Sequence, residues 1–309
     1  MSSVFQSEDF FQFLTQTGLL EPFRFSVIRG GKEIGLIQGF IQKDGGPLKR
    51  FLSRRAIING GPYLAKDITE DEVKVLLERC KTGLKGKAIY IETRNYSDYS
   101  RFRKVFENCG FTYEPHYDFF VNTNTLEVAE ENLGKSRKRD IRTSLRDGAT
   151  VIMEPSDAQI ESFYDLLSAL YLTRVKTPLF PLDFFLKLSK ESFSRFLLIE
   201  FHGEIIGGTV CVFDDSTVYE WFACGKDGVY KSVFPSTLAT WSGIKFAAES
   251  GHEHFDMMGA GSPGDGGYGV REFKAKFGGE LVEYGRFKYI CNKPLYAIGN
   301  WGVKLMKKR

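Results

Sequence analysis

Apolar and polar positions along the chain follow two different periods, which predict a mixture of helices and strands. Apolar residues three and four positions apart are typical of helices, and alternating or continuous apolar runs are typical of strands. A glycine pair at 30–31 lies between two such runs, as in a tight hairpin. The first half is therefore expected to contain helix 8–17, strands 23–29, 33–42 and 55–59, helix 69–80, strand 87–93, helix 98–109 and strands within 111–122.

The second half repeats this order. The hairpin motif GKEIG at 31–35 recurs as GEIIG at 203–207, and hairpin, strand, helix, strand, helix and strand follow one another in both halves. This recurrence predicts a duplicated α+β module. The expected elements are helices 157–173 and 182–189, strands 195–201, 204–213 and 218–224, helix 235–249, strand 254–258, a glycine-rich loop 259–269, helix 272–277 and strand 280–290.

A basic segment, 134–146, separates the two halves and carries six positive charges and one negative charge. On a helix, four of its basic residues share one face: Lys135, Arg139, Arg142 and Arg146. The segment fits either a solvated helix that connects the halves or a docking face for phosphate groups. We therefore expect four parts, which are an N-terminal domain 1–133, a basic connecting helix 134–149, a C-terminal domain 150–292 and a basic tail 293–309.

The charge balance excludes a globally basic DNA-coating protein. The 309 residues include 42 Lys and Arg against 39 Asp and Glu, a net charge of +3. The chain has no long apolar run and no basic-then-apolar start, so we expect neither a membrane span nor a signal peptide, and a cytoplasmic location. Five cysteines without a CxxC pair are expected to be buried thiols, and the four histidines predict no metal site.

The candidate chemistry lies near the C-terminus, where an acidic residue ends a strand, a glycine-rich loop follows and a short helix carries lysines. The segments are FDMMGAG at 255–261 and GYGVREFKAKFGGE at 267–280. The motifs GxSxG, HExxH and the P-loop do not occur in the sequence. A fixed ammonium beside a glycine loop suits acyl transfer to an amine, because the ammonium stabilises the oxyanion of the tetrahedral state. Asp256 is our candidate for the group that takes the proton of the amine.

These segments, read together as FDMMGAG…GYGVREFKAKFGGELVEYG, resemble the closing motif of the FemABX family of aminoacyl transferases and of the related CelD/BioF-like acetyltransferase-fold proteins. The basic run KSRKRDIRTSLRDGATV is similar to the helix that joins the two domains of that family. The resemblance covers most of the chain. It implies an α+β fold of two tandem acyl-CoA N-acyltransferase (GNAT)-like domains, each a mixed sheet flanked by helices.

The resemblance also implies roles for individual residues. Lys274, which follows Phe273, falls on the lysine that stabilises the tetrahedral intermediate in that family. Other candidates would contact the acceptor: an arginine near a diphosphate contact, two aromatic residues near the lining of the substrate channel, and two arginines of the basic segment. The first is Arg174, the aromatic pair is Tyr219 and Trp221, and the arginines of the basic segment are Arg139 and Arg142. Phe273, beside Lys274, is a further candidate for substrate binding.

One departure from single-domain acetyltransferases bears on the donor. Their Arg/Gln-x-x-Gly-x-Gly loop, which binds the pyrophosphate of acyl-CoA, is missing here. The equivalent stretch reads YKSVFPS at 230–236. A helix that begins there still offers free N–H groups to an anion, but the tight glycine turn is lost. This departure argues against ordinary use of acetyl-CoA.

We therefore expect an N-acyltransferase that joins an activated acyl or aminoacyl group to an amine of a cell-envelope, peptidoglycan-like precursor, either UDP-linked or lipid-linked. The expected co-substrate is aminoacyl-tRNA, so tRNA is a candidate partner, and no cofactor is expected to stay bound. Two alternatives stay open: an acyl-CoA-dependent N-acyltransferase in polysaccharide biosynthesis, and a non-catalytic module that binds anionic polymers. The basic tail 293–309 is either a frayed end or a weak contact with the inner leaflet.

Overall fold

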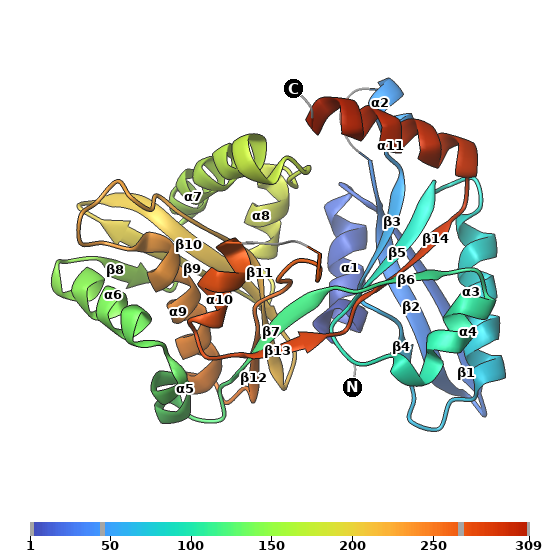
Figure 1. The fold of residues 1–309 in the computed structure, drawn as a ribbon, viewed down its shortest axis with the longest axis horizontal. Helices are drawn as coiled ribbons and strands as arrows, with labels where there is room; N and C mark the ends of the chain where they lie inside the picture. Colours follow the sequence, from blue (N-terminus) through green and yellow to red (C-terminus); the bar gives the residue numbers. More distant parts are fainter. Residues whose placement is uncertain (1–2, 44–46, 265–268, 308–309) are drawn as a thin grey trace. The chain divides into compact units, whose positions relative to one another are not determined.

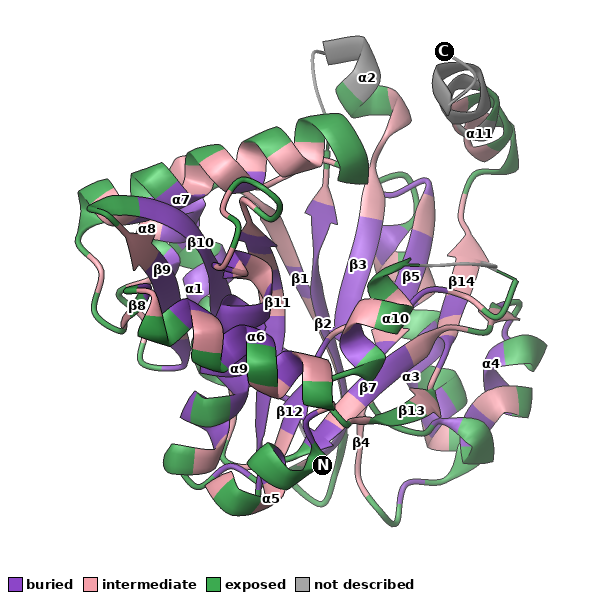
Figure 2. Ribbon diagram, turned by 60° about the vertical axis from the view of Figure 1, so that its left-hand side comes forward, coloured by how far each residue is buried: buried purple, intermediate pink, exposed green. Residues whose placement is uncertain are grey.

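The computed structural model describes residues 3–43, 47–264 and 269–307, and it divides into two compact units (Figure 1). Unit 1 comprises Met1–His116 and Tyr284–Arg309, and unit 2 comprises Tyr117–Glu283. Each unit contains one seven-stranded sheet with its own buried core. In Figure 2 the buried residues concentrate on the strands of the two sheets.

The sheet of unit 1 has the strand order β1-β2-β3-β5-β14-β6, and β4 pairs with β2. The strands are β1(Glu21–Arg29), β2(Lys32–Gln42), β3(Arg55–Gly60), β4(Tyr63–Leu64), β5(Tyr90–Asn95), β6(Thr112–Glu114) and β14(Arg286–Ile290). The α-helices of the unit are α1(Glu8–Thr17), α2(Pro47–Leu52), α3(Glu70–Leu84), α4(Arg103–Asn108) and α11(Lys293–Lys307), and 3-10 turns lie at Val4–Gln6 and Ser100–Phe102.

Helix α3 illustrates how the sequence builds this unit. Thr69 caps the helix, because its hydroxyl accepts from the Glu72 amide at 3.3 Å while Glu72 accepts from the Thr69 amide at 2.9 Å. The buried face of α3 then packs on the apolar face of the sheet, which includes Ile58 and Ile91. That helix face consists of Val73, Leu76, Leu77, Cys80 and Leu84.

The sheet of unit 2 has the strand order β13-β7-β12-β11-β10-β9-β8. The strands are β7(Tyr117–Asn122), β8(Thr150–Ile152), β9(Ser194–Phe201), β10(Glu204–Phe213), β11(Thr217–Gly225), β12(His254–Asp256) and β13(Glu280–Glu283). The helices are α5(Leu126–Asn132), α6(Lys135–Arg146), α7(Asp157–Leu170), a π-helical turn η3(Tyr171–Val175), α8(Leu182–Leu188), α9(Pro235–Glu249) and α10(Gly269–Ala275). Helix α9 is buried on almost every side, so the core of this unit surrounds it.

Each sheet is completed by a strand from the other half of the sequence. In unit 1, β14 lies between β5 and β6 and is antiparallel to both. In unit 2, β7 lies between β12 and β13 and is antiparallel to both. The two sheets also share one parallel pair at the same place, β3 with β5 and β11 with β12. The predicted duplication is therefore present, with the last strand of each half exchanged.

The exchange changes the predicted domain boundaries. We expected the first domain to end at residue 133, but β7 and the helices that follow it belong to unit 2. We also expected one strand over 280–290 in the second domain, whereas the chain breaks at Gly285 and β14 joins unit 1. The break has a physical cause, because Gly285 has φ +65°, a conformation that glycine adopts at little cost.

Smaller differences concern the termini of elements. The helix expected at 272–277 spans Gly269–Ala275, and part of the glycine-rich loop, 265–268, lies outside the described residues. The basic segment is helical, as predicted, in α6. The expected tail is helix α11, although the side chains of 302–309 also lie outside the described residues. Among the helices that the structure describes, none combines the length and the apolar character needed to cross a lipid bilayer.

Gly285 gives a test of the strand exchange. A Cβ at this position would collide with the Tyr113 ring, and its backbone would also be held at a positive φ. Gly31 has φ +78° but open space around it. We expect G31A to lower the free energy of unfolding by about 1–2 kcal/mol from backbone strain alone. G285A is expected to cost roughly a further 1–3 kcal/mol from overpacking, measured by urea denaturation. Equal losses in the two variants would contradict the close packing at Gly285.

Candidate active site

The candidate site of unit 2 is built on a sharp turn at the end of β12. Asp256, the last residue of this strand, accepts a hydrogen bond from the Met258 amide at 2.7 Å through Oδ1. Met258 has φ +54° and Gly259 has φ +94°. A non-glycine residue in the left-handed region is strained, and such strain concentrates at functional sites. The turn directs the carbonyl groups of Met257 and Gly259 toward α10.

Lys274 projects from α10 onto this turn. Its ammonium donates hydrogen bonds to the carbonyl oxygen of Met257 and, at 2.8 Å, to that of Gly259. The residue is only 9% exposed. An ammonium has three donors, and no third acceptor from the described part of the chain is in contact with it. The geometry therefore fixes the ammonium and leaves one N–H without a partner among the described residues.

Three buried carboxyl groups interact electrostatically with the Lys274 ammonium. Asp118 comes from the exchanged strand β7, Glu220 from β11 and Asp256 from β12. Burial raises the pKa of all three, and the positive charge of Lys274 partly offsets this effect. One ammonium cannot balance three carboxylates in a dry core, so the cluster must retain protons.

Asp256 is the group that retains a proton most firmly. Burial, and then the negative charge of Asp118 beside it, raise the pKa of Asp256 well above the usual range. Its Oδ2 is buried and has no hydrogen-bond partner among the described residues. Asp118 is the natural ionised partner, because its Oδ1 accepts from the Phe119 and Gly259 amides at 2.7 and 2.8 Å.

Tyr219 lies on β11 beside this cluster and is buried. Its hydroxyl donates to Asp214 Oδ2 at 3.2 Å. Burial, with the charges of Asp214 and Asp256, raises the pKa of Tyr219 well above its ordinary value. The phenol is therefore neutral and donates its proton in a hydrogen bond to Asp214.

Arg137 was not among our candidates, yet it is the arginine of the basic helix α6 that contacts the site. Its guanidinium lies 4.3 Å from the centroid of the Phe273 ring and 5.1 Å from that of Phe277. It also pairs with Asp140 at 3.5 Å. Arg137 thus packs on one aromatic ring within α10 and on one just after it, and these contacts join α6 to the helix that carries Lys274. Lysine and arginine content alone gave no sign of this, because Arg137 lies off the basic face of the helix.

The structure does not bring the predicted arginines to Lys274 by any contact among the described residues. Arg139 and Arg142 are exposed on α6, and Arg139 pairs with Asp140 at 3.0 Å. Arg174 is exposed on the π-helical turn η3. Trp221 is half-buried on β11 and packs against the Phe184 ring, with centroids 5.7 Å apart.

Two amides at the N-terminus of α9 are already bound by the protein's own groups. The Ser236 amide donates to Asp227 Oδ1 at 3.1 Å, and the Phe234 amide donates to the Ser144 hydroxyl at 3.0 Å. We expected free N–H groups here for an anion. Asp227 instead supplies a negative charge at this helix end, where a bound anion would otherwise be favourable.

Unit 1 contains a separate charged network on one face of its sheet. Glu92 is buried and lies 3.1 Å from Arg94, 3.6 Å from Arg286 and 3.8 Å from Lys288. Although burial acts to raise it, these cations lower the pKa of Glu92. Lys288 also pairs with Glu114 at 2.7 Å. Three cations therefore share two carboxylates, and two of these cations arrive on the exchanged strand β14.

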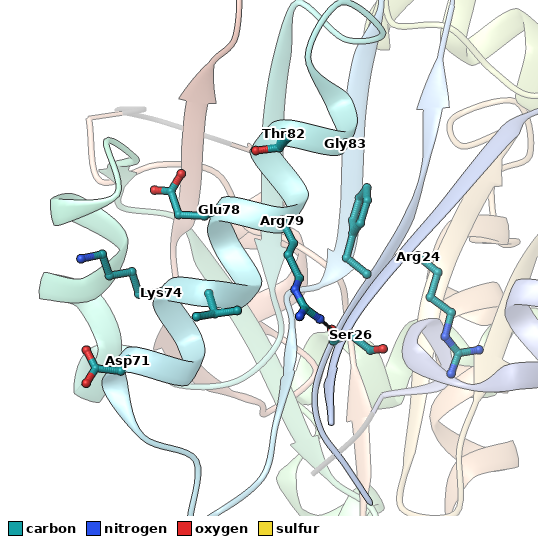
Figure 3. A pocket seen from close by; sticks show the side chains of 10 residues that line it. Arg24, Ser26, Asp71, Lys74, Glu78, Arg79, Thr82 and Gly83 are labelled. Atoms are coloured by element: carbon teal, nitrogen blue, oxygen red, sulfur yellow. Dashed lines mark hydrogen bonds between the residues drawn. The ribbon is translucent and has the colours of Figure 1, made fainter. Parts of the chain in front are cut away.

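A groove of about 950 Å³ lies in unit 1 between β1 and α3, and Figure 3 shows the side chains that line it. Arg79 of α3 reaches across it and donates to the Ser26 carbonyl at 2.6 Å. Arg24, also on its wall, pairs with Glu33 at 3.4 Å. We assign this groove no ligand, because its arginines are engaged within the unit. Among the described side chains, no three His, Cys, Asp or Glu residues gather as metal ligands would.

Comparisons with known proteins agree with this architecture. The chain has the fold of the crystal structure of FemX, with a TM-score of 0.71, 15% identity, and coverage of 96% of this chain and 94% of that one. L-PGS from Bacillus licheniformis matches with a TM-score of 0.60 and 16% identity, over 97% of this chain and 93% of that one. A tandem GNAT protein from the clavulanic acid biosynthesis pathway matches with a TM-score of 0.53 and 9% identity, over 89% and 84%.

The fold is thus that of tandem GNAT-like domains, as predicted. The sequence also matches the FemAB family over residues 198–302, a segment that contains Glu220, Asp256 and Lys274. This match and the FemX-like fold agree with the resemblance to FemABX proteins that the sequence motifs indicated. Comparison with curated protein sequences finds no match.

The raised pKa of Asp256 predicts a characteristic pH dependence of stability. An unfolded Asp loses its proton near pH 4, whereas folded Asp256 keeps it to higher pH. Between these values the folded state binds more protons, so the wild type loses stability as pH rises. D256N mimics the protonated form, so its stability relative to wild type should increase from pH 5 to pH 8 in urea denaturation. D215N, at an exposed position, is the control and should follow wild type. Parallel curves for D256N and wild type would show that Asp256 is ionised.

Proposed function

We propose that the protein is an N-acyltransferase of the FemABX type, which forms an amide between an activated aminoacyl group and an amine of a cell-envelope precursor. The observation that carries this proposal is the Lys274 ammonium, held by two carbonyl groups with one donor remaining. It lies within the segment that matches the FemAB family. Such a fixed donor in a dry site is suited to an oxyanion.

In the proposed reaction the acceptor amine attacks the carbonyl carbon of the donor ester. The C–N bond forms, the carbonyl oxygen becomes an oxyanion beside Lys274, and the C–O bond to the leaving group then breaks. The proton lost by the amine ends on the leaving oxygen. Asp256 is our candidate for accepting that proton; because burial and Asp118 raise its pKa, we propose that Asp256 and Asp118 also hold the turn that positions Lys274.

The donor in this proposal is aminoacyl-tRNA. The support is the N-terminus of α9, where Asp227 and Ser144 take the amide hydrogen bonds that an acyl-CoA pyrophosphate would need. A negative carboxylate at that point repels a pyrophosphate. The acyl-CoA alternative draws its support from the fold alone, which is shared with a tandem GNAT protein.

For the acceptor we propose a precursor that carries both an amine and a phosphate, UDP-linked or lipid-linked. The cation-rich face of unit 1, with Arg94, Arg286 and Lys288, supports an anionic ligand. On unit 2, the exposed residues Arg174, Arg139 and Arg142 remain our candidates for phosphate contacts. Tyr219, Trp221 and Phe273 remain candidates for shaping the substrate channel.

Lys274→Met tests the oxyanion role. This variant keeps the chain length but removes the charge, and we expect kcat to fall by about 100-fold or more, the effect of losing one oxyanion donor. Lys276→Ala, an exposed lysine two residues away, should leave kcat unchanged. The assay measures transfer of a radiolabelled amino acid from charged tRNA to a UDP-linked muropeptide.

A second variant separates chemistry from folding. Lys274→Met leaves Asp118 without its cation, so the double variant D118N/K274M restores the charge balance. Both proteins are checked by thermal melting. Wild-type turnover in either folded variant would remove Lys274 from the mechanism.

Ligand-induced stabilisation tests the donor. A ligand present at 100 times its Kd stabilises the folded state by about 2.7 kcal/mol. We expect charged tRNA to raise the melting temperature, deacylated tRNA to raise it less, and acetyl-CoA to leave it unchanged. Stabilisation by acetyl-CoA instead would favour the acyl-CoA alternative. Stabilisation by any polyanion, lost steeply with salt and without turnover, would favour the non-catalytic module.

A further inference from the structure

Helix α11 has one face that packs on unit 1. The Tyr296 ring contacts the Tyr90 ring edge-on, with centroids 5.5 Å apart. One turn further, a Cβ built on Gly299 would lie 3.5 Å from the Leu52 carbonyl oxygen of α2. Tyr296 and Gly299 are three positions apart, so they share a face of the helix. This face is covered by α2 and by the sheet of the unit.

A second face of α11 carries large apolar residues that the unit leaves exposed. Ile298 and Trp301 lie three positions apart on this face, and Leu295, three positions before Ile298, is half-buried. Ile298 is 52% exposed and Trp301 is 67% exposed. On the neighbouring helix α2, Phe51 is 50% exposed. Two helices in mutual contact thus present three bulky apolar side chains to solvent, a concentration that marks an interaction site.

Positive charge surrounds these apolar residues in the sequence. Residues 293–309 contain five Lys and Arg and no acidic residue, and residues 47–55 contain four and no acidic residue. Arg54 lies over the Phe51 ring, 4.5 Å from its centroid, and donates to the Phe51 carbonyl at 3.1 Å. Aromatic residues flanked by Lys and Arg are the composition of segments that lie at the boundary between lipid headgroups and acyl chains.

We propose that the surface formed by α2 and α11, defined by Phe51, Ile298, Trp301 and the basic residues Arg50, Arg54 and Lys293, binds the face of an anionic lipid bilayer. The apolar side chains enter the headgroup boundary, and the basic residues contact the negative headgroups. Charge complementarity selects this partner over a second copy of the chain, because a symmetric dimer would set two acid-free basic segments against each other. The binding does not depend on the proposed acyl transfer.

Sedimentation with lipid vesicles tests this proposal. Wild-type protein should pellet with phosphatidylglycerol-containing vesicles, much less with pure phosphatidylcholine vesicles, and less as salt is raised. The double variant I298S/W301S should bind the anionic vesicles about tenfold more weakly or worse, since it removes the inserting side chains. V229S, at a 66% exposed valine of unit 2, is the matched control and should bind like wild type. Thermal melting verifies that all variants fold.

Tryptophan fluorescence provides a second readout. The sequence has three tryptophans. Trp221 is half-buried and Trp241 is buried, both in unit 2, whereas Trp301 is exposed. Its emission should shift to shorter wavelength on addition of anionic vesicles, and W301F should lose that shift. Unchanged vesicle binding by I298S/W301S would overturn the proposal. So would sedimentation velocity showing that wild type is a dimer and that this variant is a monomer, because the surface would then be an interface between copies.

Discussion

The architecture depends on the pairing of two strands that each half of the chain gives to the sheet of the other. β7 and β14 both lie between two antiparallel neighbours, so each supplies hydrogen bonds on both edges and closes a sheet that would otherwise have a gap. The exchanged strands also bring charged side chains from one half of the sequence into the unit formed by the other half. β7 carries Asp118 to the turn after β12, and β14 carries Arg286 and Lys288 to the carboxylate of Glu92.

The two units have opposite excesses of buried charge: carboxyl groups exceed cations around Lys274 in unit 2, and cations exceed carboxylates around Glu92 in unit 1. In unit 2 one ammonium faces three buried carboxyl groups, and burial raises the pKa of all three, that of Asp256 most strongly. In unit 1 the cations outnumber the carboxylates, and Glu92 is held in its charged form. Burial disfavours every isolated charge. The first arrangement therefore fixes a single donor rigidly, and the second keeps positive charge in excess on a partly exposed sheet face.

The sequence predicted the order of elements well, because amphipathic spacing and glycine turns are local signals. The capping box at Thr69 and the hairpin around 203 are examples. The sequence also singled out Lys274 and Asp256, through a motif in one continuous stretch. It missed Asp118 and Arg137, since both reach the site through tertiary structure: one by strand exchange and one by packing on Phe273. Glu220 carried a usable signal, a lone acid within an apolar strand.

The exchanged strands set the order in which the protein matures during synthesis. Unit 2 has all its strands once residue 283 has been made, but the sheet of unit 1 stays open between β5 and β6 until β14 follows. The unit that contains the N-terminus is thus translated first but completes its sheet last, whereas domains usually fold in order from the N-terminus during synthesis. Until then its unpaired edges are exposed to the nascent chain and to chaperones. A polypeptide truncated before residue 286 would leave that sheet permanently unfinished.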